Sequence, residues 1–236
     1  MKAAALPANE TDRLKSLAAY QILDTLPEGV YDDITRIACE IAGTPIALLS
    51  LIDSNRHWVK SSEGLDVREI PREYSFCAHA ILNPDEMLVV EDTRYDERFH
   101  DNPLTKSDPG VIFYAGVPIV NDGGFALGSL CIIDSRPRTL TDNKLMALKA
   151  LAKLVMAHFE LRKTKLELER IHQEFIKASQ SQAPSHLSMT DQAHGLVQNI
   201  LANVQTLVAN GARPDQASQL ASLKESAHAL KTALDH

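Results

Sequence analysis

The sequence has few cysteines, few aromatic side chains and no long apolar run. Three of its 236 residues are cysteines, and aromatic residues make up 5%. No stretch approaches the roughly 18 uninterrupted apolar residues that a membrane-spanning helix needs. The segment before Pro7 is also too short for the apolar part of a secretory signal. We therefore expect a cytoplasmic protein that does not associate with a membrane.

Positive charge is also scarce. The formal net charge is -7, and no run of Lys or Arg occurs. A net acidic chain repels a phosphate backbone, so we expect no nucleic-acid partner. The cysteines are odd in number and lie in apolar runs, which is typical of buried free thiols. Cys77 and His79 could contribute half of a zinc site, but no CxxC accompanies them, and we expect no metal.

Up to about residue 140 the sequence alternates between helix and strand patterns. Apolar spacing predicts helices at 10–23 and 30–42, the second closed by Gly43. The Asn-Asp-Gly-Gly segment at 121–124 predicts a tight hairpin, since these residues tolerate positive φ. The other expected elements are strands near 45–53, 57–64, 87–92, 111–120 and 125–134, a short helix at 75–83 capped by Ser75, and a loop with helical turns at 93–109.

Beyond Leu140 the pattern becomes that of one long helix. It begins at Thr141 or Asp142 and continues to about Ser179 without Gly or Pro. Apolar residues repeat every seven positions, with mostly small residues at the alternate position, which predicts a two-helix coiled coil. The residues expected at this contact are Leu154, Leu161, Leu168, Ile171 and Phe175. The alternative is a long amphipathic helix that lies on its own domain.

The last part of the chain predicts a helical hairpin. A polar segment at 179–188 precedes two amphipathic patterns, at 189–209 and 215–235. A single hairpin of this size buries too little apolar surface to be stable alone. Two copies packed as a four-helix bundle would bury enough, so the sequence predicts a homodimer.

Residues 10–158 resemble the GAF family as it occurs in bacterial sensor kinases. The resemblance is carried by the segments RLKSLAAYQILDTLPE, TPIALLSLID, RHWVKSSEGL, IPREYSFCAHAI, RFHDNPL, FYAGVPI and LGSLCIIDSRPR. It implies an α+β fold with a six-stranded antiparallel sheet and flanking helices. The expected organisation is a GAF sensor domain at 1–140, a coiled-coil signalling helix at 141–180 and a helical hairpin at 181–236.

The resemblance also implies a ligand pocket beside the short helix after the second and third strands. The residues expected at this pocket are Trp58, Phe76, Cys77, His79, Phe113, Tyr114 and Cys131. Related sequences often carry Arg where this chain has Ile112, so an anionic ligand held by that Arg would not be held here. The cofactor is unknown: a cyclic nucleotide, haem, a bilin and no ligand at all remain open.

The tail resembles a second family. Residues 195–207 are similar to the phosphoacceptor helix of a class of histidine kinases, but Gly195 stands where the phosphoaccepting His should be. A shifted alignment would use His194. No ATP-binding domain follows in this sequence, so we expect a degenerate kinase dimerisation hairpin and a protein that is not an enzyme.

The favoured interpretation is a sensory GAF protein of two-component signalling. Binding of a small molecule or partner would shift the long helix against its dimer mate, and a response regulator or histidine kinase would respond to the change. Two alternatives stay open. One is a phosphotransfer protein that uses His194 or His228, and the other is a GAF-type methionine sulfoxide reductase that uses Cys77 and Cys131.

Overall fold

The computed structural model of the protein describes residues 1–181, 193–195, 197–202, 224–225 and 227–228. Two compact units divide the chain, residues 1–168 and residues 169–236, and each is described by itself. In the described part of the chain, no helix is both long and apolar enough to cross a bilayer.

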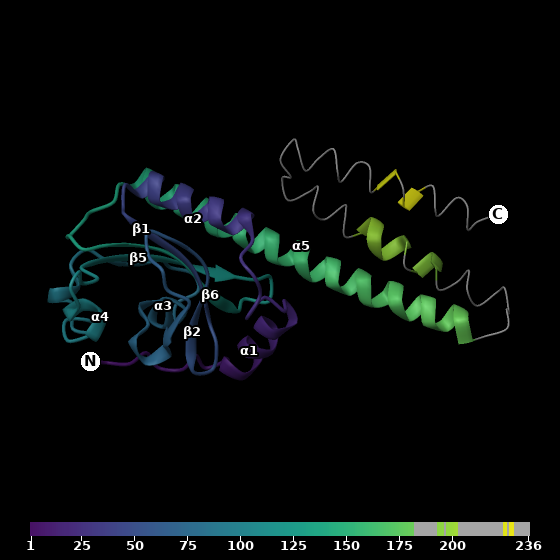
Figure 1. Cartoon of the computed structure of the whole chain (residues 1–236), viewed down its shortest axis with the longest axis horizontal. Helices are drawn as coiled ribbons and strands as arrows, with labels where there is room; N and C mark the ends of the chain where they lie inside the picture. The colour runs from purple at the N-terminus through teal and green to yellow at the C-terminus, as the bar shows by residue number, and fades with distance from the viewer. Residues whose placement is uncertain (182–192, 196, 203–223, 226, 229–236) are drawn as a thin grey trace. The chain divides into compact units, whose positions relative to one another are not determined.

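A six-stranded sheet forms the centre of the first unit (Figure 1). The strand order is β3-β2-β1-β6-β5-β4, and every neighbouring pair is antiparallel. This confirms the predicted α+β fold with an antiparallel sheet. The strands are β1 (Ile46–Ile52), β2 (Arg56–Glu63), β3 (Glu69–Pro71), β4 (Leu88–Val90), β5 (Phe113–Val120) and β6 (Ala126–Asp134).

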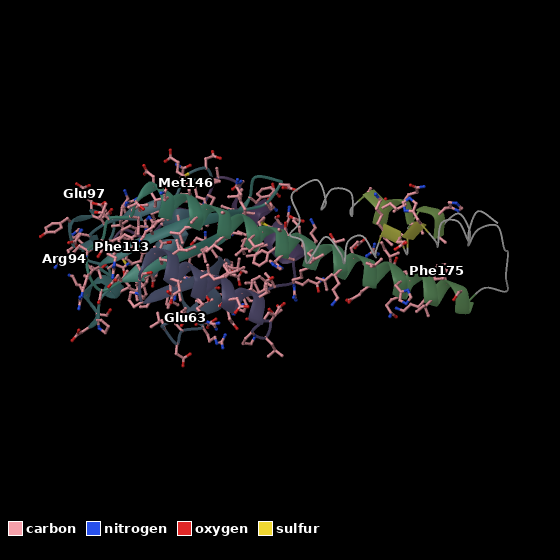
Figure 2. All side chains as sticks on the ribbon, turned by 90° about the horizontal axis from the view of Figure 1, so that it is seen from above. Glu63, Arg94, Glu97, Phe113, Met146 and Phe175 are labelled. Carbon is pink, nitrogen blue, oxygen red and sulfur yellow. The ribbon has the colours of Figure 1, made fainter. Side chains whose placement is uncertain are left out.

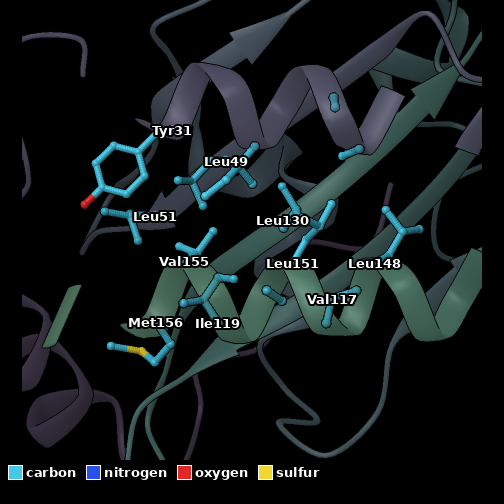
Figure 3. Close-up of a cluster of buried hydrophobic side chains, with 14 of the residues drawn as sticks. Tyr31, Leu49, Leu51, Val117, Ile119, Leu130, Leu148, Leu151, Val155 and Met156 are labelled. Carbon is cyan, nitrogen blue, oxygen red and sulfur yellow. The ribbon is translucent and has the colours of Figure 1, made fainter. Parts of the chain in front are cut away.

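Three helices cover one face of the sheet, which we call the helical face. They are α1 (Glu10–Ala19), α2 (Gly29–Ala42) and the first part of α5 (Asp142–Ser181). Figure 3 shows apolar side chains of α2, α5 and the strands pointing toward one another in this cluster. Lys144 at the start of α5 donates to the Ala42 carbonyl at 2.8 Å, and the Tyr31 and Phe159 rings lie 5.7 Å apart. The start of α5 thus lies at the end of α2, and a later turn of α5 lies at the start of α2, so the two helices are antiparallel.

Shorter segments cover the opposite face, which we call the α3 face. They are η1 (Arg72–Tyr74), α3 (Phe76–Ala80), η2 (Thr93–Tyr95) and α4 (Pro103–Lys106). Ser75 caps α3 as predicted, because its hydroxyl accepts a hydrogen bond from the Ala78 amide at 3.0 Å. Both faces of the central strands are therefore buried, as the continuous apolar run of β1 indicates.

Two local predictions differ from the structure. The first helix ends at Ala19, before the predicted 23, because Gln21 and Asp24 adopt positive φ angles of 45° and 59°. The short helix at 75–83 is helical only to Ala80. By contrast, Gly43 ends α2 as predicted, with a φ of 70° that a residue without Cβ adopts at little cost.

The long helix is confirmed in extent, and its first part lies on its own domain, as the alternative interpretation predicts. One side of α5 packs on the helical face through Leu148, Leu151, Ala152, Val155, Met156 and Phe159. The other side carries the α5 stripe, which we define as Met146, Ala150, Leu154, Ala157, Leu161 and Leu168. Leu154 is half-buried at its edge and also packs against the helical-face cluster. Within it Leu161 is 46% exposed and Leu168 is 40% exposed. Figure 2 shows Met146 near the start of α5 and Phe175 farther along it. The dimeric coiled coil stays a prediction.

Hydrogen bonds fix α5 to the loop after α1 near the end of its buried side. Arg162 donates to the carbonyls of Tyr20 and Gln21, at 3.0 and 2.9 Å. Tyr20 donates its hydroxyl to the Glu160 carboxylate at 2.5 Å. These three contacts lie within one helical turn, and we call them the Arg162 anchor.

The second unit is described in part. Residues 193–195 and 197–202 are helical, as are 224–225 and 227–228. Val197 and Leu201 are buried in one cluster with Ala227. The remaining residues of the two helices predicted at 189–209 and 215–235 lie outside the described residues.

Candidate functional site

Two cysteines meet at the α3 face. Cys77 lies in the first turn of α3, and Cys131 lies on β6 in register with Leu48 of β1 and Gly116 of β5. Their sulfur atoms are 3.7 Å apart, and each residue is 1% exposed. Both are free thiols. The fold thus brings together Cys77 and Cys131, which the sequence analysis pairs only in the methionine sulfoxide reductase alternative.

Tyr114 completes this sulfur pair. Its hydroxyl donates to Cys77 Sγ at 3.3 Å and lies 3.5 Å from the Ser129 hydroxyl. Gly116 leaves the space for that hydroxyl, because a Cβ atom there would lie 2.2 Å from it. Burial, together with the nearby sulfurs, raises the pKa of Tyr114 well above its usual value. Tyr114 therefore keeps its proton and serves as a donor to Cys77.

His57 lies behind the cap of α3. Its Nδ1 is 2.8 Å from the Ser75 hydroxyl, and its Nε2 is buried with no hydrogen-bond partner among the described residues. Burial lowers the pKa of His57, so the ring is neutral near pH 7. An unpaired nitrogen of a neutral buried imidazole can accept a proton or bind a polar group. Sequence reasoning missed His57, since only the cross-strand register places it on this face.

The two thiols differ in acidity. Burial opposes ionisation of Cys77, but the hydrogen bonds with Cys131, Ser129 and Tyr114 outweigh it and lower its pKa. The hydrogen bond with Cys77 and burial raise the pKa of Cys131. Cys77 is therefore the sulfur of this pair that ionises first.

A surface cavity lies at the other end of α3. Its volume is about 420 Å³, and its lining includes Lys2, His79, Glu86 and Arg98. His79 Nε2 is 3.1 Å from the Lys2 carbonyl oxygen, so the N-terminal segment forms one wall. The Met1 amine also contacts the Asp101 carboxylate. Burial lowers the pKa of His79, which leaves Lys2 and Arg98 as the cations of the cavity.

The seven predicted pocket residues fall into two groups. Phe76, Cys77, Tyr114 and Cys131 belong to the cluster at the α3 face, and His79 lies beside it at the cavity. Phe76 links them, since its ring lies 4.2 Å from Phe99 and 5.2 Å from Tyr114. Trp58 and Phe113 instead belong to the cluster of the helical face, across the sheet. The role of this set in ligand binding stays a prediction.

The other proposed chemistry has less structural context. Across the residues the structure describes, no group of three or more His, Cys, Asp or Glu side chains could hold a metal ion. His194 lies in a helical turn of the second unit, where its role as a phosphoacceptor stays a prediction.

Comparison with known proteins identifies the family of the fold. The chain belongs to the GAF family, because the GAF domain model matches residues 27–159. A cyclic di-GMP phosphodiesterase of Pseudomonas aeruginosa is 40% identical to it over 152 residues. That match covers 64% of this chain and 26% of the relative, so the chain spans about a quarter of the relative's length.

Solved structures with the same fold have lower identity. A GAF domain region of a Geobacter sulfurreducens membrane protein is 18% identical, with a TM-score of 0.46, and the match covers 65% of this chain and 99% of that one. A domain of a Sinorhizobium meliloti two-component sensor histidine kinase is 17% identical, with a TM-score of 0.45, and the match covers 61% and 96%.

These findings identify a GAF protein of the signalling and regulatory kind and correct one expectation. The expectation that the protein is not an enzyme is wrong, because a relative with 40% identity is named a phosphodiesterase. The shared segment is the GAF part of the chain. Sequence reasoning judged enzymatic activity only from motifs inside this chain.

Proposed function

We propose that this chain is the sensory part of a signalling protein that controls the turnover of cyclic di-GMP through a dimer of α5. The observation that carries the proposal is the α5 stripe, which is exposed except at Leu154 while the opposite side of the same helix packs on the sheet. A helix with apolar residues on both sides can connect its own domain to a second helix.

A second copy of the chain is the partner that fits this stripe. Its residues are spaced by three, four or seven positions, as at a coiled-coil contact, and a twofold dimer brings the same surface together from both protomers. Ala150 and Ala157 permit close approach of the two helices. Ile171 and Phe175 continue the spacing beyond the stripe.

The relative supports cyclic di-GMP turnover as the output. Its identity of 40% to this chain is well above the 17% of the sensor-kinase domain, which indicates fold alone. A response regulator or histidine kinase, as in two-component signalling, is the alternative partner, supported by the resemblance of residues 195–207 to a kinase dimerisation helix.

The input is a small molecule or partner at the α3 face. The cavity beside α3 is lined by Lys2, Glu86 and Arg98, the last of which also pairs with Asp96, so the ligand that it suits is a small polar one. Such a ligand controls the output only if it binds two arrangements of α5 with different affinity.

The first test measures self-association of the full chain by light scattering at micromolar concentration. We expect the wild type to be a dimer and the double variant Leu161→Glu plus Leu168→Glu to be a monomer, because charges at the contact are desolvated and repel each other. The matched control, Lys149→Gln plus Gln173→Glu, changes the net charge by the same amount at exposed positions outside the stripe. A monomeric wild type, or a dimer that persists in the stripe variant, contradicts the proposal.

The second test addresses the output. Residues 1–168 of this chain replace the corresponding part of the Pseudomonas phosphodiesterase, and hydrolysis of cyclic di-GMP is measured. We expect the chimera to be active and its rate to change several-fold with the Leu161→Glu change, but not with Lys149→Gln. If neither Leu161→Glu nor Lys149→Gln alters the rate of hydrolysis, α5 does not control this activity.

A further inference from the structure

The sulfur pair at the α3 face is not used by the function proposed above. The two sulfur atoms are in van der Waals contact at 3.7 Å, and a disulfide requires about 2.05 Å. Bond formation therefore needs an approach of roughly 1.7 Å. Movements of this size lie within the range of a side-chain rotation combined with a small shift of one element.

The α3 side of the pair is held less firmly than the β6 side. Cys131 lies on β6, which is hydrogen-bonded to β1 and to β5, so its backbone is held from both sides. Cys77 lies on a helix of five residues. Side-chain contacts hold this helix, chiefly the Ser75 cap and the stacking of Phe76 on Phe99. Short helices of this kind contribute little stability of their own.

The polar groups around Cys77 favour its thiolate, and because the residue is 1% exposed, a hydroperoxide reaches it only when α3 moves. Tyr114 donates a hydrogen bond to it, and this donor stabilises a thiolate more than a thiol. The neutral His57 ring also lies on this face, and its unpaired Nε2 can accept a proton. Cys131 lies in contact with Cys77, in the position of a resolving thiol.

We propose that Cys77 and Cys131 form a reversible disulfide when the protein meets a hydroperoxide, which makes the α3 face a redox input of the GAF unit. The Cys77 thiolate attacks one peroxide oxygen, the O–O bond breaks, and an alcohol (or water, from hydrogen peroxide) leaves with the proton lost by Cys77. The Cys131 thiol then attacks the sulfenic acid and releases water. The two thiols lose two electrons and two protons, and the hydroperoxide gains them.

Formation of this disulfide would change the shape of the cavity beside α3. His79 is two residues beyond Cys77 on the same short helix, and it contacts the Lys2 carbonyl on the cavity wall. A shift of α3 toward β6 therefore moves His79 relative to the N-terminal segment. This input does not depend on the α5 dimer, so a failure of the dimer test leaves it standing.

The test exposes the full chain to hydrogen peroxide, quenches it with acid and alkylates it after unfolding. Intact mass should show a loss of two hydrogens, and one thiol should remain alkylatable, that of Cys39. Peptide mapping should locate the crosslink between Cys77 and Cys131, and a dithiol reductant should restore all three thiols. Three alkylatable thiols in the oxidised wild type would overturn the proposal.

Cys39 provides the matched control. It is also a buried free thiol, but it lies on α2 in the cluster of the helical face, and burial raises its pKa to about 11. The Cys39→Ser variant should form the disulfide at the wild-type rate, whereas Cys77→Ser and Cys131→Ser should form none. The disulfide should form faster than Cys39 is oxidised by about tenfold or more. Equal oxidation rates of Cys39 and Cys77 in the wild type would contradict the assigned reactivity. This comparison is made within the wild-type protein, so it remains valid even if a variant misfolds.

Discussion

The two faces of the sheet carry side chains from the same strands, but they differ in how completely their buried polar groups are hydrogen-bonded. At the helical face Lys60 is buried, and its ammonium group donates to Thr25, the Leu26 carbonyl and Glu28, each at 2.7 Å. At the α3 face, the Ser50 hydroxyl and His57 Nε2 have no partner within the described ranges. Buried polar groups are usually satisfied, and exceptions tend to mark sites with another role. From this comparison we expect stability to be concentrated at the helical face and reactive chemistry at the α3 face.

The strongest test of this comparison is Phe159→Ala at the helical face. Phe159 is fully buried, with its ring 5.9 Å from that of Tyr20 and 5.7 Å from that of Tyr31. Its removal leaves a cavity between α5 and α2 and should lower the free energy of unfolding by about 3–5 kcal/mol. Urea unfolding followed by fluorescence of the single Trp, Trp58, measures this for the first unit.

Tyr95→Ala is the matched aromatic control for this prediction. Tyr95 is 83% exposed, so its replacement should change the free energy of unfolding by about 0.5 kcal/mol or less. Similar losses for Phe159→Ala and Tyr95→Ala would show that the helical face is not the main source of stability.

An intermediate effect is expected for Gly116→Ala at the α3 face. The new methyl group would lie 2.2 Å from the Tyr114 hydroxyl, so the buried ring must shift. We expect a loss of about 1–3 kcal/mol in the free energy of unfolding. In a Tyr114→Phe background the loss should be smaller, because the atom in closest contact is gone. An identical loss in both backgrounds would exclude this contact as the cause.

The smallest effect concerns an ionic contact between α1 and the segment before α3. Glu10 accepts hydrogen bonds from Arg13 at 2.7 Å and from Arg72 at 2.5 Å. Burial raises the pKa of Glu10, but the two guanidinium groups outweigh it and hold the value at about 2. A carboxylate with a depressed folded-state pKa stabilises the protein above its unfolded pKa of about 4.3, and this contribution disappears as pH falls toward 2.

Glu10→Gln should therefore lower the free energy of unfolding by about 1–2 kcal/mol at pH 7, after allowance for solvent screening. The difference from the wild type should vanish between about pH 4 and pH 2. Urea unfolding across this range provides the measurement, with the exposed Asp12→Asn as control. A difference that persists unchanged at pH 2 would exclude the charge of Glu10 as its source.

Much of the fold could be predicted from local patterns. The hairpin at 121–124 is an example, since Asn121 Oδ1 accepts hydrogen bonds from the amides of Gly123 and Phe125, and Gly124 has a φ of 76°. The Ser75 cap and the Gly43 stop are further cases in which one residue type satisfies a local backbone requirement. Such signals need no knowledge of the tertiary structure.

The site was less accessible to sequence reasoning, because tertiary register decides it. Alternation along a strand separates two faces but does not tell which face receives the helices, and so Trp58 and Phe113 were grouped with Tyr114. A register shift between Leu49 and Ser50 further changes how β1 meets β2. The contact of Cys77 with Cys131, and the position of His57 behind Ser75, arise only when helix and sheet pack together.

The Arg162 anchor limits how α5 can transmit a change. Arg162 donates to two successive carbonyl groups, and Glu160 accepts a hydrogen bond from the Tyr20 hydroxyl. Sliding of α5 along the sheet would therefore break all three hydrogen bonds at once. Tilting about that point preserves them. If the domain signals through α5, as we propose, the signal would therefore be a change in the direction of the helix about the Arg162 anchor, and not a movement along its axis.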